Sequence, residues 1–195
     1  MTLFDLSGRI ALITGSSRGI GRVIATALAD AGATVVLNGL NEERLEATRA
    51  EFAAAYGDDR VHARAFDVTD APAVAAAVAE VERTVGPLRI LVNNAGIQHR
   101  EPLLDLSVDD WNRVMTANLT SAFLVGREVA RGMLARGEGK IINIASVQTD
   151  LARPTIAPYT ASKGGIRNLT RAMTAEWAGG GLQIMRSPPA TSTPR

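Results

Sequence analysis

The chain has 195 residues, 46% of them hydrophobic, and its 21 Lys plus Arg against 20 Asp plus Glu leave a net charge of +1. This length suits one domain with its own core, and the charge balance gives no electrostatic reason to expect nucleic acid or an anionic membrane as a partner. The absence of cysteine excludes a disulfide scaffold and a thiolate nucleophile, and we expect no metal site. Residues 1–8 do not resemble a signal peptide and no apolar run could span a bilayer, so we expect a cytoplasmic protein.

Short apolar runs alternate with longer helical stretches along the whole chain. In chain order, the sequence predicts a strand at 10–14, a helix at 19–31, a strand at 34–37, a helix at 42–55, a strand at 61–66, a helix at 71–85, a strand at 88–92, a helical region at 107–135, a strand at 140–144 and a helix at 156–178. Such alternation is typical of βαβ units. It predicts an α/β fold with a doubly wound, parallel sheet of the Rossmann type and helices on both faces.

Three glycines, Gly15, Gly19 and Gly21, mark the junction where the first predicted strand passes into the first helix. Gly15 permits a tight turn, Gly19 lets the backbone approach a pyrophosphate, and Gly21 allows the helix to pack closely on the strand. The unpaired N–H groups of the helix start would hold the pyrophosphate. At this junction the pattern favours dinucleotide binding over a bare turn. We expect the loop to contribute six residues to that site: Gly15, Ser17, Arg18, Gly19, Ile20 and Gly21.

The end of the second predicted strand bears on the choice of cofactor. An acidic residue there would hold the ribose hydroxyls of NAD, but the sequence has Gly39 followed by Leu40. Arg18 could instead meet the 2′-phosphate of NADP, although it could also be a solvated surface charge. The sequence therefore favours NADP over NAD.

Tyr159 and Lys163 lie four residues apart and so share one face of a helix. The ammonium group and the helix N-terminus would both favour the phenolate, so Tyr159 could exchange a proton with a carbonyl or an alcohol. Ser146, just after the fifth strand, could hold the same substrate oxygen, and Asn118 could hold a water that links Lys163 to solvent. Taken singly, Ser146 could also be a helix cap and Asn118 a helix-bend residue.

These motifs resemble the short-chain dehydrogenase/reductase family: Thr14-Gly-x-x-x-Gly-x-Gly21, Asn93-Asn-Ala-Gly96 and Tyr159-x-x-x-Lys163. The resemblance implies an NAD(P)-dependent enzyme that interconverts a secondary alcohol and a ketone, in a homo-oligomer (dimer or tetramer). It implies four catalytic residues: Asn118, Ser146, Tyr159 and Lys163. It also adds seven residues to the cofactor site: Asp67, Val68, Asn94, Ala95, Gly96, Tyr159 and Lys163.

Local segments at 96–100, 146–148 and 151–159 resemble the gluconate 5-dehydrogenases of that family, which interconvert D-gluconate and 5-keto-D-gluconate. This implies a sugar-acid substrate, whose expected ligands are Arg100, Ser146, Gln148 and Tyr159. Arg100 could also be a solvated loop charge, and His99 could be either a hydroxyl ligand or a loop residue. The alternatives are a 3-oxoacyl-carrier-protein reductase, another sugar-alcohol dehydrogenase, or a non-catalytic dinucleotide-binding remnant.

The resemblance stops near residue 184, which gives an incomplete dinucleotide-binding domain at 1–184 and a Pro/Ser/Thr-rich tail at 185–195. We expect this tail to be disordered and to supply no packed strand. Deleting one adenine from codons for the family's Ile-Asn-Ala-Ile-Ala-Pro-Gly-Tyr-Ile-His-Thr-Glu-Met continuation yields the tail and then a stop, so we interpret it as a single-base frameshift near residue 185. The C-terminal strand and helices of the family would then be missing, and we expect weak or absent turnover.

Overall fold

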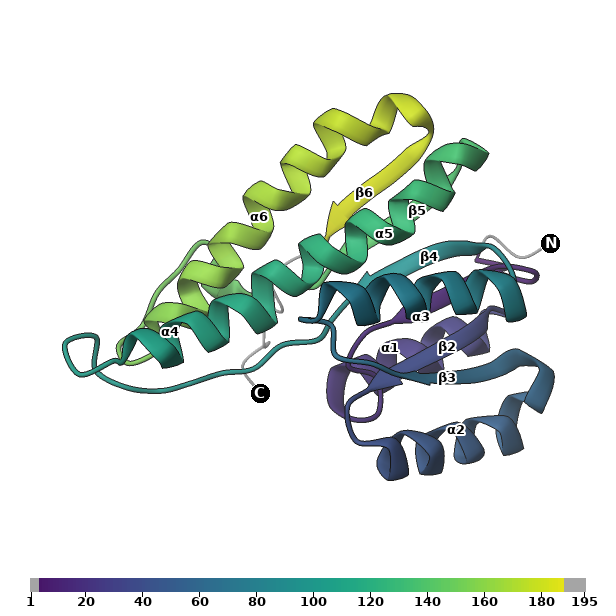
Figure 1. Ribbon diagram of the computed structural model, residues 1–195, viewed down its shortest axis with the longest axis horizontal. Helices are drawn as coiled ribbons and strands as arrows, with labels where there is room; N and C mark the ends of the chain where they lie inside the picture. Colours follow the sequence, from purple (N-terminus) through teal and green to yellow (C-terminus); the bar gives the residue numbers. More distant parts are fainter. Residues whose placement is uncertain (1–3, 188–195) are drawn as a thin grey trace.

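The computed structural model describes residues 4–187, which form a six-stranded parallel sheet in the order β3-β2-β1-β4-β5-β6 with helices on both faces (Figure 1). The strands are β1 (Ile10–Ile13), β2 (Thr34–Gly39), β3 (Val61–Ala65), β4 (Leu88–Asn93), β5 (Gly139–Asn143) and β6 (Leu182–Arg186). The helices are α1 (Gly19–Asp30), α2 (Glu42–Tyr56), α3 (Ala71–Thr84), α4 (Val108–Met115), α5 (Ser121–Arg136) and α6 (Ala157–Trp177). The predicted Rossmann-type architecture is confirmed.

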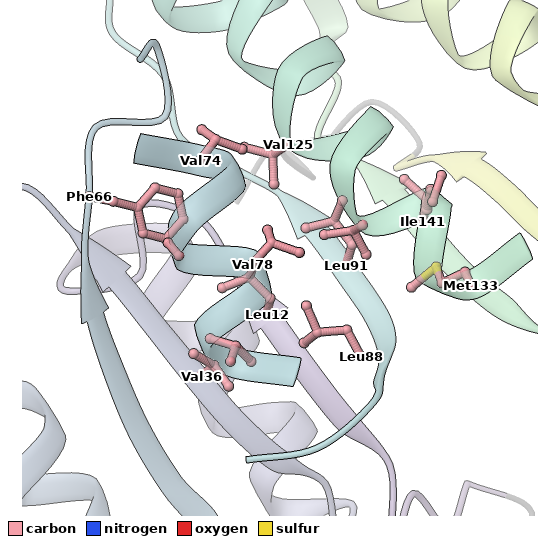
Figure 2. Packing of buried hydrophobic residues seen from close by; sticks show 14 of the residues in the cluster. Leu12, Val36, Phe66, Val74, Val78, Leu88, Leu91, Val125, Met133 and Ile141 are labelled. Atoms are coloured by element: carbon pink, nitrogen blue, oxygen red, sulfur yellow. The ribbon is translucent and has the colours of Figure 1, made fainter. Parts of the chain in front are cut away.

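The central strands are apolar on both sides because helices cover both faces of the sheet. On one face, Leu12, Leu91 and Ile141 pack with residues of α3 and α5, as Figure 2 shows. The next residue along β1, Ile13, points to the opposite face and belongs to a second core with α1 and α2. This period-two alternation of buried side chains is what the backbone geometry of a strand requires.

The strand order reverses at β1, and this reversal places the site. β1 pairs with β2 on one side and with β4 on the other, so the connections after β1 and β4 run in opposite directions. In doubly wound sheets such a reversal leaves a crevice at the carboxyl ends of the strands. Here the glycine loop follows β1, and residues 94–97 follow β4.

The start of the predicted tail, at residue 185, corrects one sequence-based expectation. We expected five strands and no packed strand after residue 184, but β6 pairs in parallel with β5 and continues through Met185 and Arg186. Beyond it, the backbone N–H of Ala145 donates to the Ser187 hydroxyl at 2.9 Å. Residues 182–187 contain no proline, so their backbone N–H groups are free to pair with the neighbouring strand β5. The rest of the predicted tail, 188–195, lies outside the described residues.

The predicted helical region at 107–135 is interrupted in the structure. Ser107 caps α4 by accepting a hydrogen bond from the backbone N–H of Asp110. Between α4 and α5 lies a π-helical turn, η2 (Thr116–Thr120), which carries Asn118. Among the helices described between residues 4 and 187, none has both the length and the apolar character needed to cross a membrane.

Candidate active site

Thr14, at the end of β1, fastens the glycine loop to the segment after β4. Its hydroxyl oxygen accepts hydrogen bonds from the backbone N–H groups of Asn94 and Ala95, each at 3.0 Å. The Asn94 amide in turn donates to the carbonyl oxygens of Thr14 and Gly15, at 2.9 and 3.1 Å. The two loops that border the crevice are therefore held together before any ligand binds.

Two glycines leave space that a side chain would fill. Gly15 has φ +63°, and a Cβ atom there would lie 2.9 Å from the Cα atom of Ala95. A Cβ atom at Gly21 would lie 2.4 Å from both the Asn94 amide nitrogen and the Gly15 carbonyl oxygen. The positive φ of Gly15 fits the tight turn predicted there, and the lack of space at Gly21 fits the close packing of α1 predicted there.

A cavity of about 470 Å³ lies along the carboxyl edge of the sheet, from Arg44 of α2 to Ala117 of η2. At its floor, α1 begins at Gly19 (φ +58°), and its N-cap residue Arg18 makes no side-chain capping hydrogen bond within the described chain. The first N–H groups of α1 are thus left to a ligand, and an anion suits them best. Ten predicted cofactor residues line this cavity: Gly15, Ser17, Arg18, Ile20, Gly21, Asp67, Val68, Asn94, Ala95 and Gly96. The volume of the cavity, its place at the carboxyl edge of the sheet and the N–H groups at the start of α1 suit the binding of a dinucleotide.

Asn38 of β2, which the sequence did not single out, supports the same loop. Its side-chain oxygen accepts from the Gly15 N–H at 3.1 Å, and its amide nitrogen donates to the carbonyl oxygen of Phe66 at 3.1 Å. The Ser16 hydroxyl accepts from the Asn38 backbone N–H at 3.0 Å. Asn38 thereby links the ends of three neighbouring strands, and only its place before Gly39 could have indicated this role.

Tyr159 and Lys163 lie in the first two turns of α6, as predicted. The Lys163 ammonium nitrogen is 5.7 Å from the centre of the Tyr159 ring and donates to the carbonyl oxygen of Ile144 at 2.7 Å. Lys163 is 5% exposed, and this burial lowers the pKa of its ammonium group to about 8. A desolvated cation therefore stands beside a phenol.

The other two predicted catalytic residues have structural contacts of their own. Ser146 caps a short 3₁₀ turn, and its hydroxyl accepts from the Gln148 N–H at 3.2 Å. The Asn118 side chain accepts from the backbone N–H of Ile97 at 2.7 Å and donates to its carbonyl oxygen at 2.9 Å. It also donates to the Ser162 hydroxyl at 3.1 Å. Asn118 thus connects the segment after β4 to α6, while its expected role as a water ligand stays a prediction.

The predicted substrate residues are not among those lining the cavity. Arg100 is exposed, and its role stays a prediction. The Gln148 side-chain oxygen is buried without a hydrogen-bond partner in the described part of the chain. An unpaired buried acceptor is costly, so this oxygen is suited to a hydroxyl donor from a ligand.

His99 belongs to a polar cluster beside the loop rather than to the cavity. One ring nitrogen lies 2.9 Å from a Glu101 oxygen and the other 3.4 Å from the Arg113 guanidinium. Asp110 is 3.8 Å from the same ring, and hydrogen bonds from Arg113 and Ser107 lower the pKa of its carboxyl group. The three potential metal ligands, His99, Glu101 and Asp110, are close enough to share an ion, but in this structure Glu101 pairs with His99, and Asp110 accepts hydrogen bonds from Arg113 and Ser107.

The fold and the site define a dinucleotide-binding α/β oxidoreductase scaffold. The family described as short chain dehydrogenase matches residues 9–194, so the chain belongs to the short-chain dehydrogenase/reductase family. Gluconate 5-dehydrogenase of Gluconobacter oxydans is 53% identical over 182 residues, which cover 93% of this chain and 70% of that protein. The 5-keto-D-gluconate 5-reductase of Escherichia coli is 44% identical over 182 residues, covering 93% and 71%.

A solved structure extends this similarity to three dimensions. The crystal structure of a gluconate 5-dehydrogenase from Burkholderia cenocepacia, in complex with NADP and tartrate, superposes with a TM-score of 0.90 at 50% identity. The match covers 94% of this chain and 71% of that one. The family resemblance read from the motifs is therefore confirmed.

Proposed function

We propose that this chain, once continued to the length of its relatives, interconverts D-gluconate and 5-keto-D-gluconate, with NADP preferred over NAD, and that the 195-residue chain itself has weak or absent turnover. The observation that carries this proposal is the placement of the buried Lys163 ammonium 5.7 Å from the Tyr159 ring. Both residues lie on α6, which Asn118 connects to Ile97 at the edge of the cavity. The 53% and 44% identities to a gluconate 5-dehydrogenase and a 5-keto-D-gluconate reductase support the substrate.

In this proposal the Tyr159 hydroxyl gives its proton to the ketone oxygen in reduction, which leaves a phenolate, and in oxidation the Tyr159 phenolate takes the alcohol proton. The Lys163 ammonium stabilises the negative charge that develops on the phenolic oxygen, and its low exposure strengthens that interaction because little water screens it. The Ser146 hydroxyl holds the same substrate oxygen in place. The nicotinamide cofactor, when bound, supplies or accepts the hydride.

The sugar acid is held by polar side chains near this centre. Arg100 offers an exposed guanidinium to the carboxylate, a geometry that favours paired hydrogen bonds. The buried Gln148 oxygen accepts a hydrogen bond from one of the hydroxyl groups, which supplies the partner it lacks among the described residues. Binding of tartrate, a small hydroxy acid, to the relative from Burkholderia cenocepacia supports this class of ligand.

The test is turnover of gluconate with NADP⁺ and of 5-ketogluconate with NADPH, measured for this chain and for a frame-restored form that continues after Ile184 with the family's sequence. We expect turnover in the restored form and a loss of about 10²–10⁴-fold in kcat on Tyr159→Phe, with NADPH binding retained. Undiminished turnover of Tyr159→Phe contradicts the mechanism. A larger kcat/KM for an acetoacetyl thioester than for 5-ketogluconate contradicts the substrate and favours a 3-oxoacyl reductase.

A further inference from the structure

The cavity ends, on the side of β2, at two arginines from different elements. Arg18 precedes α1, and Arg44 lies in the first turn of α2; both line the cavity together with Gly39 and Leu40. Asn41 caps α2, because its side-chain oxygen accepts from the backbone N–H of Arg44 at 2.7 Å. The cap fixes where the Arg44 side chain leaves the helix.

Neither arginine is neutralised by a carboxylate. Over residues 4–187, no acidic side chain lies within 4.0 Å of the guanidinium group of Arg18 or Arg44, whereas Arg49, one turn further along α2, pairs with both Glu46 and Asp58. Two unpaired positive charges that border one cavity repel each other. An anionic ligand between them would remove that repulsion.

Gly39 has little room for an acidic residue that would select NAD. A Cβ atom at this position would lie 2.9 Å from the Ser17 hydroxyl oxygen and 3.2 Å from the Ser17 Cβ. Leu40 follows and offers no hydrogen-bond donor on its side chain. The cationic surface at this end of the cavity therefore comes from Arg18 and Arg44.

We infer that Arg44 is a specificity-determining residue that, together with Arg18, binds the 2′-phosphate of the adenosine ribose. This inference rests on the proposed preference for NADP. A guanidinium group binds a phosphate through two parallel hydrogen bonds. Because the side chain of Leu40 carries no charge, Arg44 is the residue that supplies a second positive charge beside Arg18.

The decisive probes are adenosine 2′,5′-bisphosphate and 5′-AMP, because they differ only in the 2′-phosphate. Binding of each to the purified 195-residue chain is measured by titration calorimetry, which needs no turnover. We expect Arg44→Ala to weaken binding of the bisphosphate by about 10-fold or more and to leave binding of 5′-AMP unchanged. Arg44→Lys, which keeps the charge, restores part of the loss. The control is Arg83→Ala, at the last turn of α3, which does not line the cavity and should change neither affinity.

The outcomes separate the two proposals. If Arg18→Ala weakens bisphosphate binding but Arg44→Ala does not, the NADP preference stands and the role of Arg44 is wrong. If the unmodified chain binds both nucleotides equally, or binds neither, the NADP preference fails and the role of Arg44 fails with it. An equal loss of both nucleotides on Arg44→Ala overturns the inference as well, because it shows damage to the loop rather than loss of a phosphate ligand.

Discussion

The Lys163 ammonium group lies over the Tyr159 ring and donates a hydrogen bond to the carbonyl oxygen of Ile144. Ile144 is the residue that directly follows β5. The lysine thus joins the end of a central strand to the first turns of α6. Because it is buried, the pKa of its ammonium group falls from 10.5 to about 8. A depressed pKa means that the folded protein carries this charge at a cost in stability, and such costs are common at functional sites.

This cost gives a pH-dependent prediction for Lys163→Met. The folded pKa of about 8 lies below the 10.5 of the unfolded chain, so between these values the unfolded state binds more protons and the free energy of unfolding rises with pH. Below pH 8 the cost is fully present, about 3 kcal/mol from the size of the shift. Lys163→Met removes it, so the stability of the variant relative to the parent should be highest below pH 8 and should fall as the pH approaches 10.5.

Urea unfolding of both proteins at pH 7, 8, 9 and 10 measures this difference. Lost packing and the lost bond to Ile144 shift the variant by a constant amount, so only the slope against pH reports the buried charge. A difference in stability that stays constant from pH 7 to 10 would mean that Lys163 is not desolvated in the folded protein.

The second prediction concerns the Thr14 hydroxyl, which accepts from two backbone N–H groups after β4. Thr14→Val keeps the shape but leaves both donors without an acceptor, so we expect a loss of about 2 kcal/mol in unfolding free energy and weaker nucleotide binding. Thr14→Ser keeps the hydroxyl and is the matched control. Equal stability of the Val and Ser variants, measured by urea unfolding, would exclude this role for the hydroxyl.

Some residues of the site could be predicted from the sequence and others could not, because only some of them belong to local sequence patterns. Glycine positions and the Tyr159–Lys163 spacing are local patterns, so they could be read directly. The roles of Asn38 and Asn118 could not, because each depends on partners 20 or more residues away: Gly15 and Phe66 for Asn38, and Ile97 and Ser162 for Asn118. Arg44 was missed for the same reason, since only the fold brings it to the cavity that Arg18 lines.

The fold shows the same division between local and non-local signals. The spacing of apolar residues, together with glycines at the ends of elements, predicts the first five strands, each followed by a helical stretch. β6 has exposed Gln183 and Met185 among its residues and gains its strand structure from parallel pairing with β5. Its continuation past residue 184 depends on that neighbour, and the composition of the tail alone did not reveal it.

Gly21 gives the third prediction, with a control in the same chain. Gly21→Ala would place a methyl group 2.4 Å from the Asn94 amide nitrogen and the Gly15 carbonyl oxygen, so we expect a loss of about 1–3 kcal/mol in stability and at least 10-fold weaker binding of adenosine 2′,5′-bisphosphate. At Gly164, within α6, a methyl group would meet no atom within 4 Å, so Gly164→Ala should raise stability by about 0.5–1 kcal/mol. If both substitutions stabilise the chain, the close approach at Gly21 is not present in solution.

The last prediction tests whether Asn118 positions the catalytic helix through Ser162. The Ser162 hydroxyl accepts from the Asn118 amide at 3.1 Å and donates to the Tyr159 carbonyl oxygen at 2.7 Å, so the three residues form one chain of hydrogen bonds. Both Asn118 and Ser162 are buried, and removal of either leaves the other with one of its buried hydrogen bonds unmade. A double-mutant cycle of Asn118→Ala and Ser162→Ala should therefore give a coupling of about 1 kcal/mol in unfolding free energy.

The control for this cycle pairs Asn118→Ala with Thr84→Ala. Thr84, at the end of α3, makes its own bond to the Glu80 carbonyl oxygen and shares no partner with Asn118, so the two effects should add. Additivity of Asn118→Ala and Ser162→Ala to within about 0.3 kcal/mol would show that the bond between them carries no free energy. The position of Tyr159 would then depend on the packing of α6 alone, and kcat of the frame-restored form should not respond to Ser162→Ala.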